Sequence, residues 1–281
     1  MNALYKKLMA ALCIFTITAG QIVPFFGFEI KSDGSETTIN GQSLATQQGR
    51  HVLNKIGMSA LGCFVGYWSC SVLSSSYVPT VSRIIAGRTI FSIASDVKAG
   101  QATARSVLEE TIPAVIEAAA SECPNIKKFI ASPGQVGNHI GNIAVSLGYG
   151  EYQKAALFAS QAAGTEIGCR ISTKIGCRLF NNDGTSESNG RSELKEIGRI
   201  LGAHSGAVAI SHLVFKDPKL RNFYLKQGMY YLASRYVLFK GMDTFIPYSF
   251  FMPQDFCKLA GCNAAKQWAQ YVAQYTLKKT A

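Results

Sequence analysis

Charged residues are scarce in this sequence. They make up 16% of its 281 residues, whereas soluble domains average about 25%. Hydrophobic residues reach 48% and glycine occupies 26 positions, so the chain can bury one large core or two smaller ones. This composition excludes a disordered or low-complexity protein. The low content of charged residues favours a membrane protein, although a glycine-rich soluble helical bundle has a similar composition.

Catalytic and cofactor signatures are also missing. The sequence has no HExxH and no CxxC pair for a metal, no GxGxxG after a strand and no Walker loop. His204 and His212 lie about 80° apart round a helix axis, and no third metal ligand accompanies them. We therefore predict no metal and no cofactor, and catalytic residues stay unassigned. An enzyme with polar groups converging around His139, His204 or His212 is one alternative.

Small residues recur at every fourth position through the middle of the chain. On a helix this spacing places them on one face, so that a neighbouring helix backbone can come unusually close. We predict that these positions mediate helix packing within one chain or between copies. They are Gly62 and Gly66; Ser160, Gly164 and Gly168; and Gly198, Gly202 and Gly206.

The N-terminus has the layout of an export or anchoring signal. Lys6 and Lys7 precede an apolar run at residues 8–19, which ends in small residues. This layout predicts a signal peptide over residues 1–20, and the alternative is an uncleaved membrane anchor that extends to Phe28. Either interpretation places the protein in the secretory pathway or at a membrane.

Two segments after the signal have distinct patterns. Residues 26–40 contain Asp33-Gly34 between two β-favouring arms, which predicts a small β-hairpin. Residues 56–78 contain no charge and are long enough to span a bilayer. They also contain several serines, so a membrane helix and a buried helical hairpin are equally favoured.

A four-residue repeat occupies residues 167–178, in which Ile-Gly-Cys-Arg appears twice. On a helix this repeat places apolar, small and basic stripes side by side, and on a strand it would gather the isoleucines and cysteines on one face. Because the alanine-rich residues 152–163 run directly into the repeat, we predict one continuous helix.

The second half of the chain is predicted to be a basic helical region at residues 193–281. A polar, glycine-containing linker at residues 181–192 separates it from the helical region at 21–180, in which we expect a helix break near Pro113. Asp217-Pro218 is a strong helix start, and we expect that helix to end at Gly241. The last helix is expected at residues 263–278.

Basic residues concentrate toward the C-terminus. Residues 197–281 contain eleven basic and three acidic residues, a net charge of +8 out of +11 for the chain. Where cations alternate with aromatic rings, they suit a membrane surface more than nucleic acid, and the simplest alternative is an ordinary solvated helix. The candidate anionic-surface residues are Lys216, Lys219, Arg221, Lys226, Arg235 and Lys240.

Cysteines offer one local pair. Cys257 and Cys262 are joined by a short loop that contains glycine, so they are the candidate disulfide in an exported chain. The alternative is two buried thiols that pack as small hydrophobic groups.

These observations predict a mainly α protein, a helical bundle with small-xxx-small helix packing and a small N-terminal β-hairpin. The favoured function is structural or interactive, as an exported or membrane-associated component of a membrane-linked assembly. The alternatives are a soluble exported domain that binds an anionic partner through its basic C-terminal third, and an enzyme of unidentified chemistry. Expected partners are a membrane surface or bilayer, a second copy or another protein, with nucleic acid the least favoured.

Overall fold

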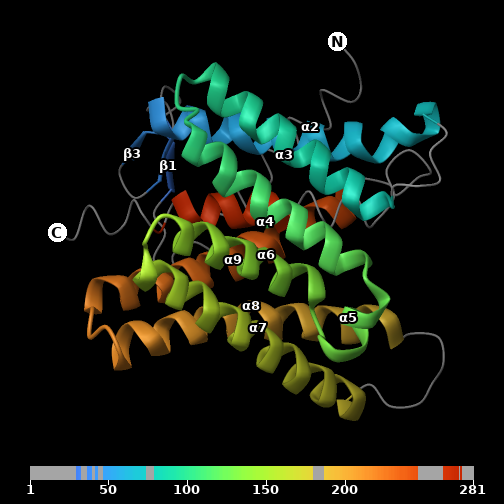
Figure 1. Cartoon of the computed structure of the whole chain (residues 1–281), viewed down its shortest axis with the longest axis vertical. Helices are drawn as coiled ribbons and strands as arrows, with labels where there is room; N and C mark the ends of the chain where they lie inside the picture. Colours follow the sequence, from blue (N-terminus) through green and yellow to red (C-terminus); the bar gives the residue numbers. More distant parts are fainter. Residues whose placement is uncertain are drawn as a thin grey trace.

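Most of the described chain is helical (Figure 1), which confirms the mainly α prediction. The computed structural model describes residues 30–32, 37–39, 42–43, 47–73, 79–179, 187–245, 262–271 and 273. Its helices are α2 (Gln47–Leu73), α3 (Thr80–Lys98), α4 (Ala104–Glu122), α5 (Pro124–Phe129), α6 (Pro133–Gly148), α7 (Tyr152–Leu179), α8 (Glu187–Leu213) and α9 (Pro218–Phe245). A further helical stretch at residues 262–271 is called the C-terminal segment. The predicted signal or anchor at residues 1–20 lies outside the described residues.

Three short strands precede the helices. β1 (Ile30–Ser32) pairs antiparallel with β2 (Thr37–Ile39), and β2 pairs with β3 (Gln42–Ser43). Ile30 lies opposite Ile39 in this register. The Asp33-Gly34 turn lies outside the described residues, so the hairpin as a whole stays a prediction.

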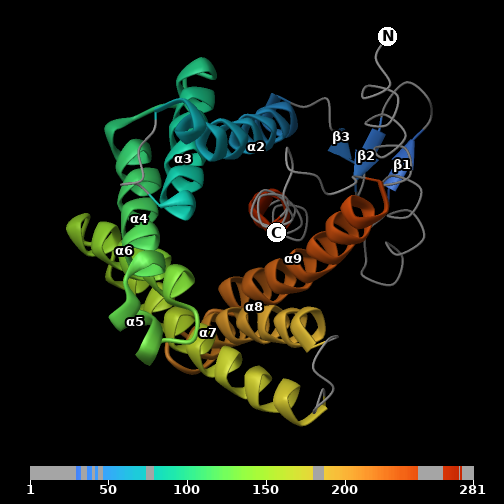
Figure 2. The same ribbon diagram turned by 90° about the vertical axis from the view of Figure 1, so that its right-hand side faces the viewer.

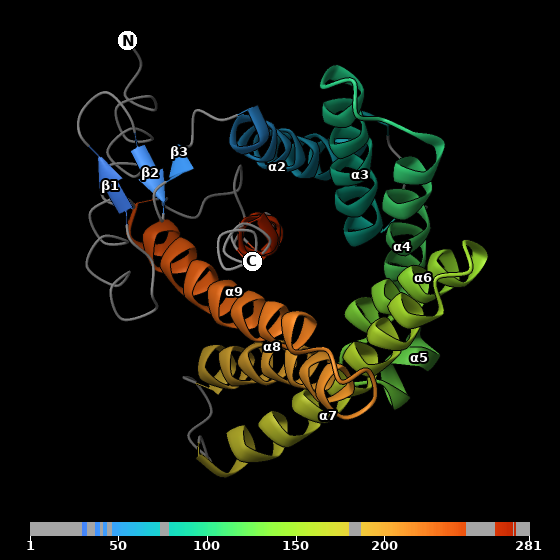
Figure 3. The same ribbon diagram turned by 90° about the vertical axis from the view of Figure 1, so that its left-hand side faces the viewer.

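Successive helices pack on one another in chain order and form a curved array. α2 packs on α3, α3 on α4, α4 on α6, α6 on α7, α7 on α8 and α8 on α9. Figures 2 and 3 show that the array bends round the C-terminal segment, which lies inside the curve. Ala265 and Ala269 of this segment are fully buried in one core with Ile200, Tyr230 and Tyr231. The end of the chain therefore packs into the concave side of the helices that precede it.

Side-chain caps account for two helix starts. At α4, the Thr103 hydroxyl accepts a hydrogen bond from the Ser106 backbone N–H at 3.0 Å, and the Ser106 hydroxyl accepts one from the Thr103 N–H at 2.8 Å. At α9, the Asp217 carboxylate accepts a hydrogen bond from the Lys219 N–H at 2.9 Å. The predicted helix start at Asp217-Pro218 is confirmed.

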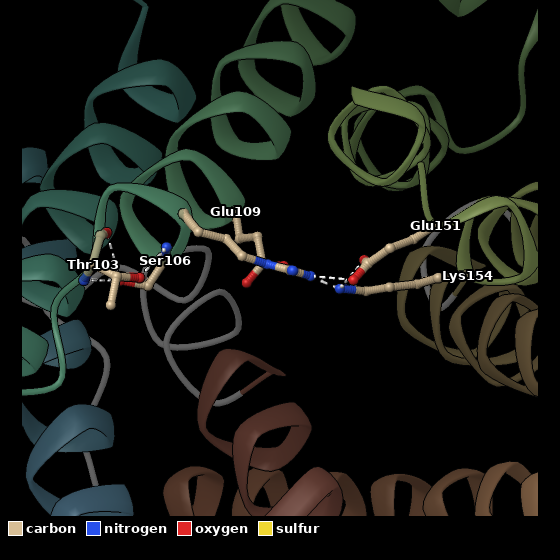
Figure 4. A network of polar contacts seen from close by, with 6 residues as sticks. Thr103, Ser106, Glu109, Glu151 and Lys154 are labelled. Atoms are coloured by element: carbon tan, nitrogen blue, oxygen red, sulfur yellow. Dashed lines mark hydrogen bonds and ion pairs between the residues drawn. The ribbon is translucent and has the colours of Figure 1, made fainter. Parts of the chain in front are cut away.

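A network of charges links the start of α4 to the start of α7 (Figure 4). Arg105 pairs with Glu109 and Glu151, and Lys154 Nζ lies 3.0 Å from a Glu109 oxygen and 3.4 Å from a Glu151 oxygen. These side chains are about one-third exposed or more. Exposed pairs of this kind add only up to about 1 kcal/mol each, so the network orients the two helix ends more than it stabilises them.

Three predicted helix limits are wrong. α4 continues through Pro113, which is buried against α6 where Gly141 leaves room for it: a β-carbon at Gly141 would lie 2.4 Å from the Pro113 Cα. α9 continues past Gly241 to Phe245, because a glycine inside a helix costs only about 1 kcal/mol. α8 begins at Glu187, before the predicted start at residue 193. Residues 187–192 of the predicted linker are therefore helical, and residues 180–186 lie outside the described residues.

The uncharged stretch at residues 56–78 falls within α2 as far as Leu73. Among the described residues, no helix is both long enough and apolar enough to cross a membrane. In α2 the serines lower the mean hydropathy, and Ser59 is fully buried. The helix packs along α3.

Candidate functional site

The small residues of α7 and α8 lie where these antiparallel helices touch. A β-carbon added at Gly164 would lie 2.1 Å from the carbonyl oxygen of Gly202, and one added at Gly168 would lie 2.0 Å from that of Gly198. Real β-carbons do not approach other atoms so closely, because ordinary contact begins near 3.4 Å. The two backbones are therefore in direct contact along this line.

The same kind of contact recurs at the other predicted small residues. A β-carbon at Gly206 would lie 2.3 Å from the Ser160 carbonyl oxygen. On α2, Gly62 and Gly66 face α3, and a β-carbon at Gly62 would lie 2.3 Å from the carbonyl oxygen of Gly87. In the structure, all of these contacts lie within one chain.

Three glycines at similar contacts were not predicted from the sequence. Gly87 of α3 completes the α2–α3 contact, and Gly137 and Gly141 of α6 pack on α4. The i, i+4 spacing of Gly137 and Gly141 was a signal that could have found that pair. Gly87 has no small residue four positions away, so only its contact across the helix pair identifies it.

Five aliphatic residues of α7 and α8 come one position before a small residue and lie on one common face of the pair; the small residues are Gly168, Ser172 and Gly176 on α7 and Gly198 and Gly202 on α8. Because the helices are antiparallel and have the same hand, side chains at equal angular offsets from the contact line point to the same side. These residues are Ile167, Ile171 and Ile175 of α7 and Ile197 and Leu201 of α8, each between 38% and 58% exposed. We call these five residues the α7–α8 face.

Exposed cations flank this face. Arg170 and Lys174 stand one position before Ile171 and Ile175 on α7, and both are exposed. Arg170 pairs with Glu166, while none of the ion pairs of the described residues includes Lys174. An aliphatic stripe beside cations is typical of helices that lie on an anionic bilayer surface.

The α7 part of the α7–α8 face could be predicted from the sequence. The four-residue repeat predicted adjacent apolar, small and basic stripes, and α7 is one uninterrupted helix, as predicted. The contribution of Ile197 and Leu201 was missed. Ile197 and Leu201 each come one position before a packing glycine, Gly198 or Gly202. That spacing identifies them as part of the face only when α7 and α8 are known to pair.

The basic residues proposed for anionic-surface binding occupy different environments. Lys216 and Lys219 are exposed around the start of α9, whereas Arg221 and Lys226 are partly buried. The Lys240 side chain lies outside the description. No single basic surface formed by the whole set is evident among these residues.

Arg235 is a correction to that set, because it is only 6% exposed. Its Nη1 lies 3.1 Å from a Glu193 carboxylate oxygen, and this ion pair compensates the buried cation. Arg235 also hydrogen-bonds the Cys262 sulfur, whose pKa is raised by burial. Cys262 is a free thiol, and Cys257 lies outside the described residues, so the predicted disulfide has no support.

Two of the three histidines considered for a catalytic site have lowered pKa values. His139 of α6 and His204 of α8 interact electrostatically with each other and with Lys266 of the C-terminal segment. Burial, reinforced by these positive neighbours, lowers the pKa of His139 to about 3 and that of His204 to about 4. Both imidazoles are therefore neutral at pH 7. His212 is exposed.

Among the described residues, no three His, Cys, Asp or Glu side chains come together as a metal site. The chain matches no protein-family model, no curated protein and no solved structure. We therefore infer its function from the surfaces and the interior of the chain itself.

Proposed function

We propose that this chain is a membrane-associated helical protein with a structural or interaction role in a membrane-linked assembly, and that the α7–α8 face binds the surface of an anionic bilayer. The observation that carries the proposal is the set of five exposed aliphatic residues on one side of two touching helices. A contiguous apolar patch on a helical surface is typical of an interaction site.

The size of this face suits reversible surface binding. Burying a whole Ile or Leu side chain is worth about 2 kcal/mol, and each residue of the face keeps roughly half of its surface exposed. Five half-buried side chains then supply about 5 kcal/mol, a dissociation constant near 0.2 mM. Each cation close to an anionic bilayer adds about 1 kcal/mol. Arg170 is already paired with Glu166, so Lys174 alone lowers the dissociation constant, to about 0.04 mM.

The small residues support the proposal through the spacing of the helices. Because Gly164, Gly168, Gly198 and Gly202 let the α7 and α8 backbones touch, the two aliphatic stripes lie close together. Larger residues would hold the helices apart and separate the stripes. In this proposal, small-xxx-small packing shapes the membrane-binding surface.

Flotation of the full chain with vesicles tests the proposal. We expect the wild-type protein to float with phosphatidylserine-rich vesicles and to stay at the bottom with pure phosphatidylcholine vesicles or at high salt. Ile171→Glu should abolish flotation, because it removes apolar area and brings a negative charge to the bilayer. Val115→Glu is the matched control, since Val115 is a 60% exposed helical residue outside this face.

Three outcomes would overturn the proposal. The first is a wild-type protein that does not float with any vesicle. The second is loss of flotation in Lys219→Glu but not in Ile171→Glu, which would assign binding to the basic C-terminal region. The third is a concentration-dependent dimer that Ile171→Glu dissociates, seen by sedimentation without vesicle binding, which would make the face a contact between copies.

A further inference from the structure

The end of α5 holds an aromatic side chain out in solvent. Phe129 is the last residue of this helix and is 74% exposed, so most of its apolar ring surface stays in water. The two residues before it, Lys127 and Lys128, are also exposed. We call these three residues the α5 tip. In Figures 2 and 3, α5 lies on the outer side of the curved array, away from the C-terminal segment.

Hydrogen bonds to α7 hold the α5 tip beside the α7–α8 face. Arg170 Nη2 donates to the Phe129 carbonyl oxygen at 2.5 Å, and the Glu166 carboxylate accepts from the Ala131 backbone N–H at 2.9 Å. Arg170 comes directly before Ile171 of the face, and Glu166 stands one turn earlier on the same helix. The tip and the face are therefore neighbouring parts of one surface.

The positive charge of the tip is not compensated. α5 contains no acidic residue, and none of the ion pairs of the described residues includes Lys127 or Lys128. The helix dipole favours lysines at this end of a helix, but it does not account for the exposed ring of Phe129. Aromatic and aliphatic side chains next to lysines are typical of helices that enter the surface of an anionic bilayer.

We propose that the α5 tip is a membrane anchor, in which the Phe129 ring inserts below the lipid headgroups while Lys127 and Lys128 bind anionic headgroups. The inference rests on the proposed function, because the anchor extends the α7–α8 face. The lysine stems are long enough to lie along the apolar boundary and keep their ammonium groups at headgroup level. Since hydrogen bonds to α7 already fix the backbone of the tip, its insertion requires little further ordering.

Flotation of the full chain over a range of phosphatidylserine-rich vesicle concentrations measures the contribution of the tip. Phe129→Ala should weaken binding about tenfold, because the ring no longer leaves water. Lys127→Gln combined with Lys128→Gln should weaken it about 25-fold, since each cation contributes a factor of about five. Two matched controls should bind like the wild type. They are Tyr152→Ala, at a 73% exposed aromatic residue at the opposite end of α7, and Lys98→Gln, at an exposed lysine at the end of α3.

Tryptophan fluorescence shows whether the side chain at position 129 enters the bilayer. In Phe129→Trp, the emission added to that of the wild-type protein should shift to shorter wavelength on vesicle binding. Lipids with brominated acyl chains should quench it. Tyr152→Trp should show neither change. Both positions are about three-quarters exposed, so these substitutions leave the core intact.

The outcomes separate this inference from the proposed function. If the wild-type protein floats, Phe129→Ala binds equally well and bromine does not quench Phe129→Trp, the anchor is wrong and the α7–α8 face stands. If Phe129→Ala weakens binding while Ile171→Glu does not, the anchor holds and the face is wrong. A wild-type protein that binds no vesicle overturns both. A dimer that Phe129→Ala dissociates in the absence of vesicle binding would make the tip a contact between copies.

Discussion

Gly202→Ala is the sharpest test of the contact between α7 and α8. The new β-carbon would lie 2.0 Å from the Gly164 carbonyl oxygen, more than 1 Å inside ordinary contact, so the helices must separate. Inserting a methyl group into a tight core costs about 1 to 3 kcal/mol, and more against rigid backbone. Alanine regains about 1 kcal/mol of helix propensity. We expect a net loss of about 2 kcal/mol.

Gly57→Ala is the matched control for this variant. Gly57 is also inside a helix, but a β-carbon there would meet nothing within 4 Å. This change should raise the free energy of unfolding by about 0.5 to 1 kcal/mol through helix propensity alone. Urea unfolding followed by circular dichroism measures both variants. A Gly202→Ala protein as stable as the wild type, or one stabilised like Gly57→Ala, would refute the proposed backbone contact.

Three further predictions concern buried charge, pH and capping. Glu117→Met should lower the free energy of unfolding by about 3 kcal/mol, because it leaves the mostly buried Arg88 without its partner 3.0 Å away. Adding Arg88→Met should recover most of that loss, as measured by urea unfolding. Because burial lowers the pKa of His139 from 6.5 to about 3, its contribution to stability is complete above pH 6.5 and is lost as the pH falls toward 3, at up to about 1.4 kcal/mol per pH unit. Tm measured between pH 7 and pH 5 should therefore fall less steeply in His139→Gln, and an identical slope would contradict the burial of a neutral ring. Asp217→Ala should cost about 1 kcal/mol by removing the cap of α9, whereas Asp217→Asn should cost much less, as thermal unfolding of the two variants will show.

Signals within one or two helical turns predicted much of the secondary structure. The repeat at residues 167–178 is helical because its alanine-rich neighbours continue into it. Asp217 starts α9 because its carboxylate reaches backbone N–H groups two and three residues ahead. Pro113 misled the prediction, because the packing of α4 on α6 outweighs the local preference of a proline to break a helix.

The sites depended on contacts that sequence spacing does not contain. Arg235 belongs by pattern to an exposed basic and aromatic stretch, yet α9 turns it toward Glu193 of α8 and buries it. The last helix was predicted from local spacing alone, yet the fold places the C-terminal segment inside the array.

The sequence by itself determined that this protein is mainly helical and that small, apolar and basic residues form stripes on its helices. Those properties depend on residues three or four positions apart, and helix geometry fixes how such residues lie relative to one another. Only the tertiary structure decided which stripes touch, which cations are buried and which polar groups share the interior. Those outcomes depend on contacts between residues far apart in the chain, and they arise when the curved array closes round the C-terminal segment.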